Sequence, residues 1–275
     1  MNRALWEKAI RDALPLLVSL LALLFLFHWL FVWLTSQISL PAMHEFLLNA
    51  LPKDWEKLSG VPFKEVATPA GRLALAWVDP LVLFAATIWA ISRGSDVVSG
   101  ELGRGSLELL LAQPIRRSSL VSIQAAVCTL GAALLALAGW LGNWVGIRTV
   151  SSVAEVDPRL FAPAAINLFG YIVFLSGVTA LASAFDRQRW RTIGLAGGFF
   201  ALQMLLQVVA RMSSSLSWVG WLTFLSAYEP QVLVARTDGA WLQLAIYNAW
   251  LLGLGGLGRG AASFVFSRRD IPAPV

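Results

Sequence analysis

Six long apolar stretches dominate the sequence, and each is long enough to cross a membrane as a helix. A transmembrane helix needs about 20 mostly apolar residues. The stretches cover residues of about 15–35, 80–98, 119–147, 161–185, 192–212 and 241–266. Only 13% of the residues are charged, whereas soluble domains carry about 25%, so too little polar surface remains for a water-soluble globule. The sequence therefore predicts an all-α polytopic membrane protein with six transmembrane helices in a single domain, residues 1–275.

The positively charged residues predict how the spans are oriented. Arg3, Lys8 and Arg11 precede the first span, and Arg268 and Arg269 follow the last. Short segments rich in such residues are typical of the cytoplasmic side. We therefore expect both termini in the cytoplasm and the chain in the cell inner (plasma) membrane. A nucleic-acid surface would cluster its basic residues among aromatic ones, and this pattern is absent, so we expect no nucleic-acid partner.

Two segments outside the spans have an apolar face or core of their own. Residues 1–14 contain NRALWEKAIRDAL, with Leu5, Trp6 and Ile10 on one helical face. This pattern favours an interfacial helix on the inner membrane surface, in contact with lipid; the alternative is a simple extension of the first span. The apolar run at 217–228 is about 12 residues long, too short for a seventh span, and is expected to re-enter the membrane or lie in its interface.

Motifs that would give the chain a catalytic or nucleotide-binding site are absent. There is no GxxxxGK[ST] phosphate-binding loop, so we expect this chain to bind no ATP. HExxH, CxxC and GxSxG are absent as well. One cysteine and two histidines are too few for a metal centre. The sequence therefore predicts neither an enzyme nor a cofactor-binding protein.

A few polar and small residues inside the spans need an explanation. Gln203 and Gln207 lie four residues apart and share a helix face. Together with Asn167 they either join helices by hydrogen bonds or line a translocation path, and packing is the favoured reading. The glycines of GLGGLGRGAA at 253–262, and Gly194 with Gly198, are expected to let helices approach closely.

A polar passage between the second and third spans, SGELGRGSLELLLAQPIRRSSL, predicts a short amphipathic helix at about 105–114. Glycines end the long second helix, Ser106 is a candidate cap for the short helix, and Pro114 ends it. Leu107, Leu110 and Leu111 form one apolar stripe. Charged residues lie on another face of this helix and just beyond it.

The same passage resembles the type-2 ABC transporter permeases (the ABC-2 family), the six-span membrane subunits of many bacterial exporters. The family pattern is approximately D-x4-E-R-x2-G-T-L-E-x-L-L-x2-P-x2-R. The matching residues are Asp96, Glu101, Gly105, Ser106, Leu107, Glu108, Leu110, Leu111, Pro114 and Arg117. Ser106 replaces the usual threonine, Leu102 stands where arginine is common, and Gln124 where many members carry lysine. The segments LSAYEP and FSRRDI also resemble parts of the family.

The resemblance implies a function. The short helix would be a coupling helix that docks in a separate ATPase subunit, which binds the ATP. Glu101, Arg104, Glu108, Arg116 and Arg117 would contact that subunit. The permease would export its substrate by alternating access, as a dimer with a second permease copy, with an extracytoplasmic accessory protein as a possible further partner.

Two questions stay open from the sequence. One ABC-2 subfamily serves maturation of nitrous oxide reductase and has about this length, but one cysteine, two histidines and four methionines make a poor copper path. The alternatives from other classes are an ATP-independent carrier or channel, and a membrane scaffold or intramembrane hydrolase.

Overall fold

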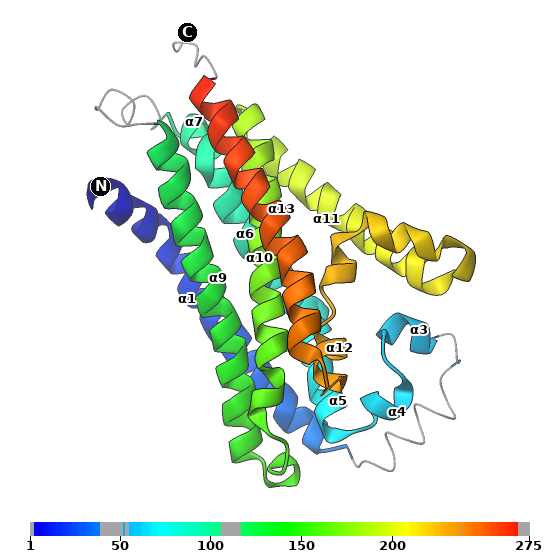
Figure 1. The fold of residues 1–275 in the computed structure, drawn as a ribbon. Helices are drawn as coiled ribbons and strands as arrows, with labels where there is room; N and C mark the ends of the chain where they lie inside the picture. Colours follow the sequence, from blue (N-terminus) through cyan, green and yellow to red (C-terminus); the bar gives the residue numbers. More distant parts are fainter. Residues whose placement is uncertain (1–2, 39–51, 53–54, 106–116, 237, 269–275) are drawn as a thin grey trace.

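Six long helices form the framework of the molecule (Figure 1). The computed structural model describes residues 3–38, 52, 55–105, 117–236 and 238–268, which contain helices and no strand. The long helices are α1 (Arg3–Ser36), α6 (Pro80–Ser95), α9 (Arg117–Thr149), α10 (Ala162–Phe185), α11 (Arg189–Met212) and α13 (Ala240–Arg268). All six belong to segments that are long and apolar enough to cross a membrane. The predicted all-α, six-span fold is confirmed.

Short helices fill the connections between the long helices. These are α3 (Trp55–Ser59), α4 (Phe63–Val66), α5 (Pro69–Ala74), η2 (Leu75–Val78), η3 (Asp96–Gly100), α7 (Glu101–Gly103), η4 (Ser151–Val153), η5 (Pro158–Phe161), η6 (Ser214–Leu222), η7 (Phe224–Ala227) and α12 (Pro230–Ala235). In Figure 1, α7 lies at one end of the bundle and α4 and α5 lie at the other. We call these ends the α7 end and the α5 end.

Local capping residues set the start of two long helices. Asp79 is the N-cap of α6, and its side chain accepts a hydrogen bond of 2.8 Å from the backbone N–H of Leu81. Pro80 then occupies the first turn, where its missing N–H costs nothing. Pro163 lies in the first turn of α10 in the same way. A proline in the first turn thus marks the start of both helices.

The N-terminal residues are continuous with the first span. Residues 3–14 form the first turns of α1, and the helix runs through Pro15 without a break. Leu5, Ala9 and Ala13 are buried. Leu5 and Ala9 lie beside residues of η3 and α9. The buried face of this segment therefore packs against the protein itself.

Helix α10 lies in the middle of the bundle and packs against α6, α9, α11 and α13. Its closest neighbour is α13, because glycines remove side-chain bulk where they meet. A Cβ atom on Gly177 would overlap with the backbone of Gly255, and one on Gly258 would press against the backbone of Gly177. The predicted packing role of the 253–262 glycines is confirmed for Gly255 and Gly258.

Helix α11 has a different relation to the bundle. It leans away from the other spans in Figure 1, and η6 continues outward from its end. A Cβ atom added to Gly194 or Gly198 would meet nothing within 4 Å. The predicted close packing of this glycine pair is therefore wrong within the described part of one chain, because that face of α11 points away from the bundle.

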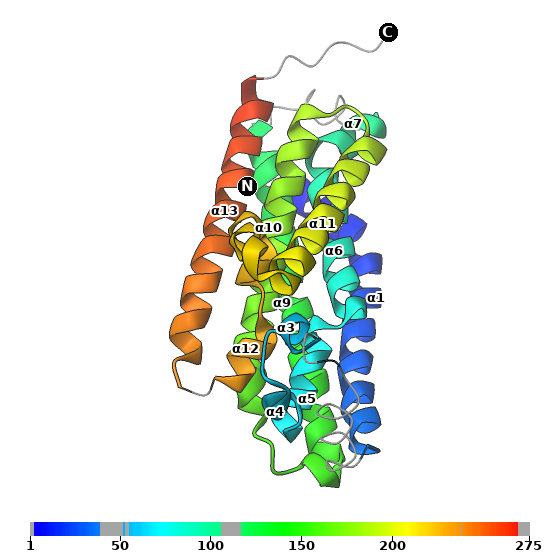
Figure 2. The same cartoon turned by 90° about the vertical axis from the view of Figure 1, so that its right-hand side faces the viewer.

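The apolar run 217–228 forms parts of η6 and η7, and it lies level with the middle of α13 in Figure 2. Trp221 and Trp218 in this run are 90% and 57% exposed. The described residues contain six candidate spans, and this run is not among them, as its length predicted.

Candidate functional site

The second span does not end as an ordinary α-helix. At the α7 end, α6 passes into one π-helical turn, η3, before the short helix α7. A π turn widens the helix and displaces its backbone hydrogen bonds. Ser183 of α10 compensates, because its Oγ accepts hydrogen bonds from the backbone N–H groups of Val98 (3.2 Å) and Ser99 (2.9 Å). The widened turn is thus held by a neighbouring span, and such turns occur frequently at functional sites.

Asp96, the first residue of this turn, is the centre of an ion-pair cluster. Its side chain is 3% exposed. Arg93 Nη2 lies 2.6 Å from Oδ2, Arg104 Nη1 lies 3.0 Å from Oδ1, and Arg189 Nε lies 3.3 Å from Oδ1. Because Arg189 opens α11, the carboxylate joins the end of the second span to the start of the fifth.

Glu101 extends the cluster to the N-terminal part of α1. Its side chain is 3% exposed and accepts a hydrogen bond of 2.9 Å from Arg104 Nη2. Lys8 forms an ion pair with the same carboxylate and a second one, at 3.3 Å, with Asp12. Arg104 thus connects both buried carboxylates, and Lys8 links α1 to α7.

The carboxylates of this cluster favour the charged form of Arg104. Burial lowers the pKa of Arg104, but the carboxylates of Asp96 and Glu101 outweigh burial, so the pKa lies above its ordinary value. A buried charge that loses its partner costs about 3–5 kcal/mol. Each member of the cluster therefore depends on the others.

Gly105 marks the point at which the chain leaves this cluster. Its φ is +68°, a conformation that favours glycine, and its N–H donates to the carbonyl oxygen of Leu102 over 3.0 Å. The predicted coupling-helix residues Ser106, Leu107, Glu108, Leu110, Leu111, Pro114 and Arg116 lie outside the described residues. Arg117 opens α9, which begins at the same end of the bundle.

The structure thus brings together three of the predicted coupling residues and separates their roles. Asp96 and Glu101 lie inside the cluster, so Glu101 does not face outward as expected, whereas the Arg104 side chain is 40% exposed. The sequence reasoning missed Lys8, Arg189 and Ser183 as partners of this site. Nothing in the local sequence around them points to contacts with residues more than eighty positions away.

A second, uncharged network contains the three residues predicted for packing or a path. Asn167 Nδ2 donates to the carbonyl oxygen of Ala227 (2.9 Å), and its Oδ1 accepts from the N–H of Glu229 (3.1 Å). Gln203 Oε1 accepts from the N–H of Phe224 over 3.1 Å. The side-chain amide of Gln207 lies 3.0 Å from Ser226 Oγ. All three amides therefore hold the segment 223–229, which we call the η7 connection, onto the spans.

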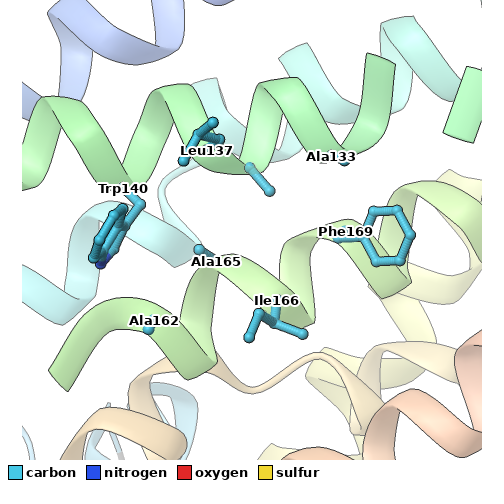
Figure 3. A pocket seen from close by; sticks show the side chains of 8 residues that line it. Ala133, Leu137, Trp140, Ala162, Ala165, Ile166 and Phe169 are labelled. Carbon is cyan, nitrogen blue, oxygen red and sulfur yellow. The ribbon is translucent and has the colours of Figure 1, made fainter. Parts of the chain in front are cut away.

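Two larger cavities lie along the spans, and neither contains a cluster of charged groups. One, of about 310 Å³, is an apolar groove between α9 and α10; Figure 3 shows Trp140, Leu137 and Phe169 around it. The other, of about 650 Å³, lies between α11, α13 and the η6–η7 region, and Gln203 is among its few polar residues. The described residues contain no group of three or more metal-ligating side chains.

The comparison with protein families covers nearly the whole chain. The family model described as ABC-2 family transporter protein matches residues 6–271. No curated protein matches the chain at significant similarity. The family match therefore extends over both networks and all six long helices.

Proposed function

Because the chain belongs to the ABC-2 family of transporter proteins, whose membrane subunits partner with an ABC ATPase subunit, we propose that ATP hydrolysis on that subunit drives this permease to export its substrate. The chain itself is a multi-pass membrane protein and a transport subunit. ATP is bound by the partner, and this chain holds no cofactor of its own. We place it in the cell inner (plasma) membrane, with the α7 end toward the cytoplasm.

The observation that carries this proposal is the buried cluster around Asp96. It joins the end of the second span, α7 and the start of the fifth span by charge-assisted hydrogen bonds. Such bonds are about twice as strong as neutral ones. A movement applied to the chain beyond Gly105 would therefore reach α6 and α11 together, through Arg104, and shift the bundle between inward-open and outward-open states.

The proposed roles of the coupling residues divide into three groups. Asp96 and Glu101 position the end of the second span, and Gly105 and Ser106 shape the exit of the chain. Leu107, Leu110, Leu111 and Pro114 hold and end the coupling helix. The residues proposed to contact the ATPase subunit are Arg104, Glu108, Arg116 and Arg117.

We further propose that two copies of the chain form the transport unit. Helix α11 supports this, because it turns large apolar side chains such as Leu195 (62% exposed) and Leu205 (64% exposed) outward. The open space beside Gly194 and Gly198 on the same helix would admit a second helix. The α5 end, with its short helices α3 to α5, is the side on which an extracytoplasmic accessory protein would bind.

Co-purification tests the proposal most directly. The tagged chain, extracted in detergent from its own cells, should retain a subunit that hydrolyses ATP. The double substitution Arg104→Glu with Glu108→Arg should release that subunit or uncouple its ATP hydrolysis from transport. Arg159→Glu, at an exposed position of the opposite end, is the matched control and should change neither.

The opposite results would favour the alternative, an ATP-independent carrier or channel. Transport by the purified chain alone in proteoliposomes, without a partner or ATP, would contradict the proposal. So would full ATP-driven transport by the Arg104→Glu, Glu108→Arg variant.

A further inference from the structure

A small chamber lies between four spans, one helical turn from Asp96. Side chains from α6, α9, α10 and α13 line it, and the polar ones are Arg93, Gln124, Cys128, Ser176 and Arg259. Its volume is about 10 Å³, close to the space that one water-sized body occupies. The family match and the proposed function assign no role to this chamber.

Arg93 reaches the chamber with hydrogen-bonding capacity to spare. Arg93 is only 4% exposed, and its Nη2 group donates to Asp96 Oδ2 over 2.6 Å. The Nε and Nη1 groups are buried and have no hydrogen-bond partner among the described residues. A buried N–H group of a charged side chain is costly when it is left unpaired. These donors therefore favour an acceptor that the described residues do not supply.

Arg259 brings a second guanidinium to the chamber from α13. Its Nη1 donates to Thr129 Oγ1 (2.6 Å) and its Nη2 to Ser176 Oγ (2.7 Å). Both partners are neutral hydroxyls, and no ion pair of Arg259 occurs within the part of the chain that the structure describes. Cationic side chains inside a membrane protein are usually paired with an opposite charge.

The nearest carboxylate cannot neutralise both arginines. Asp96 already forms ion pairs with Arg93, Arg104 and Arg189, and Arg104 forms a second ion pair with Glu101. The region between α6 and α13 thus carries an excess of positive charge in surroundings of low polarity. An anion in the chamber would be attracted by both guanidiniums at once.

We propose that this chamber binds a small inorganic anion of the halide class, such as chloride. Arg93 and Arg259 supply the charge, and the Cys128 thiol lies at the same space, whereas the Ser176 hydroxyl already donates to the carbonyl oxygen of Val173 over 3.0 Å and only holds Arg259 in place. Gln124 also lines the chamber, and its Oε1 has no hydrogen-bond partner among the described residues; an amide oriented with Nε2 inward would donate to an anion. The chamber is too small for a phosphate group, and the bound anion would link α6 to α13 beside the coupling cluster.

A chloride titration of the purified full-length chain, in detergent at constant ionic strength with gluconate as the replacing anion, tests this proposal. Chloride should raise the midpoint of thermal unfolding in a saturable way, by about 3–5 °C at tenfold excess over its dissociation constant. Bromide should act likewise, and its anomalous scattering in crystals should locate it between Arg93 and Arg259.

Arg259→Gln should remove the chloride dependence, and Arg159→Gln at the far end should leave it intact. If the Arg259→Gln chain fails to fold, the wild-type chloride titration and the position of bromide in the crystal still test whether the chamber binds an anion. Equal unfolding midpoints in chloride and gluconate would overturn the proposal in favour of a water molecule. A dependence that does not saturate, or stabilisation by anionic lipid but not by chloride, would overturn it as well.

Discussion

The α7 end and the η7 connection are both held by polar side chains, but in opposite ways. At the α7 end, buried carboxylates are each shared by several cations. At the η7 connection, the neutral amides of Asn167, Gln203 and Gln207 each bind nearby backbone or hydroxyl groups. Shared charges make every partner depend on the others, whereas separate amide bonds fail one at a time. The first arrangement suits a part that must move as a unit, and the second suits a part that must stay attached.

The largest effect should come from removing the shared charge of Asp96. Asp96→Asn keeps the size of the side chain but leaves Arg93 and Arg189 without their carboxylate. We expect a loss of about 3–5 kcal/mol in the free energy of unfolding, measured by chemical denaturation in detergent micelles, together with loss of coupled ATP hydrolysis.

The matched control for this change is Asp157→Asn. Asp157 caps η5 at an exposed position, where it accepts from the N–H of Arg159 over 2.9 Å, and asparagine caps equally well. We expect a change within about 0.5 kcal/mol. Equal effects of the two substitutions would contradict the view that Asp96 holds the cluster together.

The next largest effect should come from Glu101, which links α7 to the N-terminal turns of α1. Glu101→Gln removes the charge that Lys8 and Arg104 share. We expect a loss of about 1–3 kcal/mol, smaller than for Asp96 because Lys8 is partly exposed and has Asp12 as a second partner. Hydrogen exchange of residues 3–14 should accelerate.

A double-mutant cycle with Lys8→Met separates this link from general destabilisation. If Lys8 and Glu101 interact as the structure shows, the two substitutions together should cost less than their sum. Strict additivity, with unchanged exchange of residues 3–14, would contradict a role for this pair in attaching α1.

These cases show which parts of the molecule the sequence can predict. The six spans follow from the length and apolarity of each stretch, and the start of α6 follows from the adjacent pair Asp79-Pro80, because both signals are local. The π turn η3 depends on Ser183, and Glu101 depends on Lys8, 93 residues away. Such contacts exist only after the spans have packed, so no local sequence pattern predicts them.

The glycines illustrate the same limit. Gly255 and Gly194 look equivalent in the sequence, since both lie among small residues in an apolar span. Only Gly255 meets a neighbouring backbone, because α13 packs along α10 while this face of α11 points outward. A glycine motif therefore predicts that a helix can be approached closely, but not which helix approaches it.

Among the amides of the η7 connection, Asn167 should matter most. It is fully buried and binds both Ala227 and Glu229. Asn167→Ala should lower the free energy of unfolding by about 1–2 kcal/mol, less than Asp96→Asn. Denaturation measured side by side for the two variants gives the comparison directly. An effect as large as that of Asp96 would show that the connection, too, behaves as a cooperative unit.

The smallest effects should come from the two glutamines, and they also test whether these residues hold the connection or line a path. Gln203 is 6% exposed and binds the backbone of Phe224, whereas Gln207 is less buried and Arg211 beside it keeps an ion pair of 2.8 Å with Glu229. We expect Gln203→Leu to lower the free energy of unfolding by about 1 kcal/mol and Gln207→Leu to lower it by less than about 0.5 kcal/mol.

Quenching of tryptophan fluorescence by brominated lipid should change mainly in Gln203→Leu, because Trp218 and Trp221 lie in the adjoining η6. If these residues hold the connection, the rank order of transported substrates should not change in either variant, and a changed order with unaltered stability would assign them to the path instead.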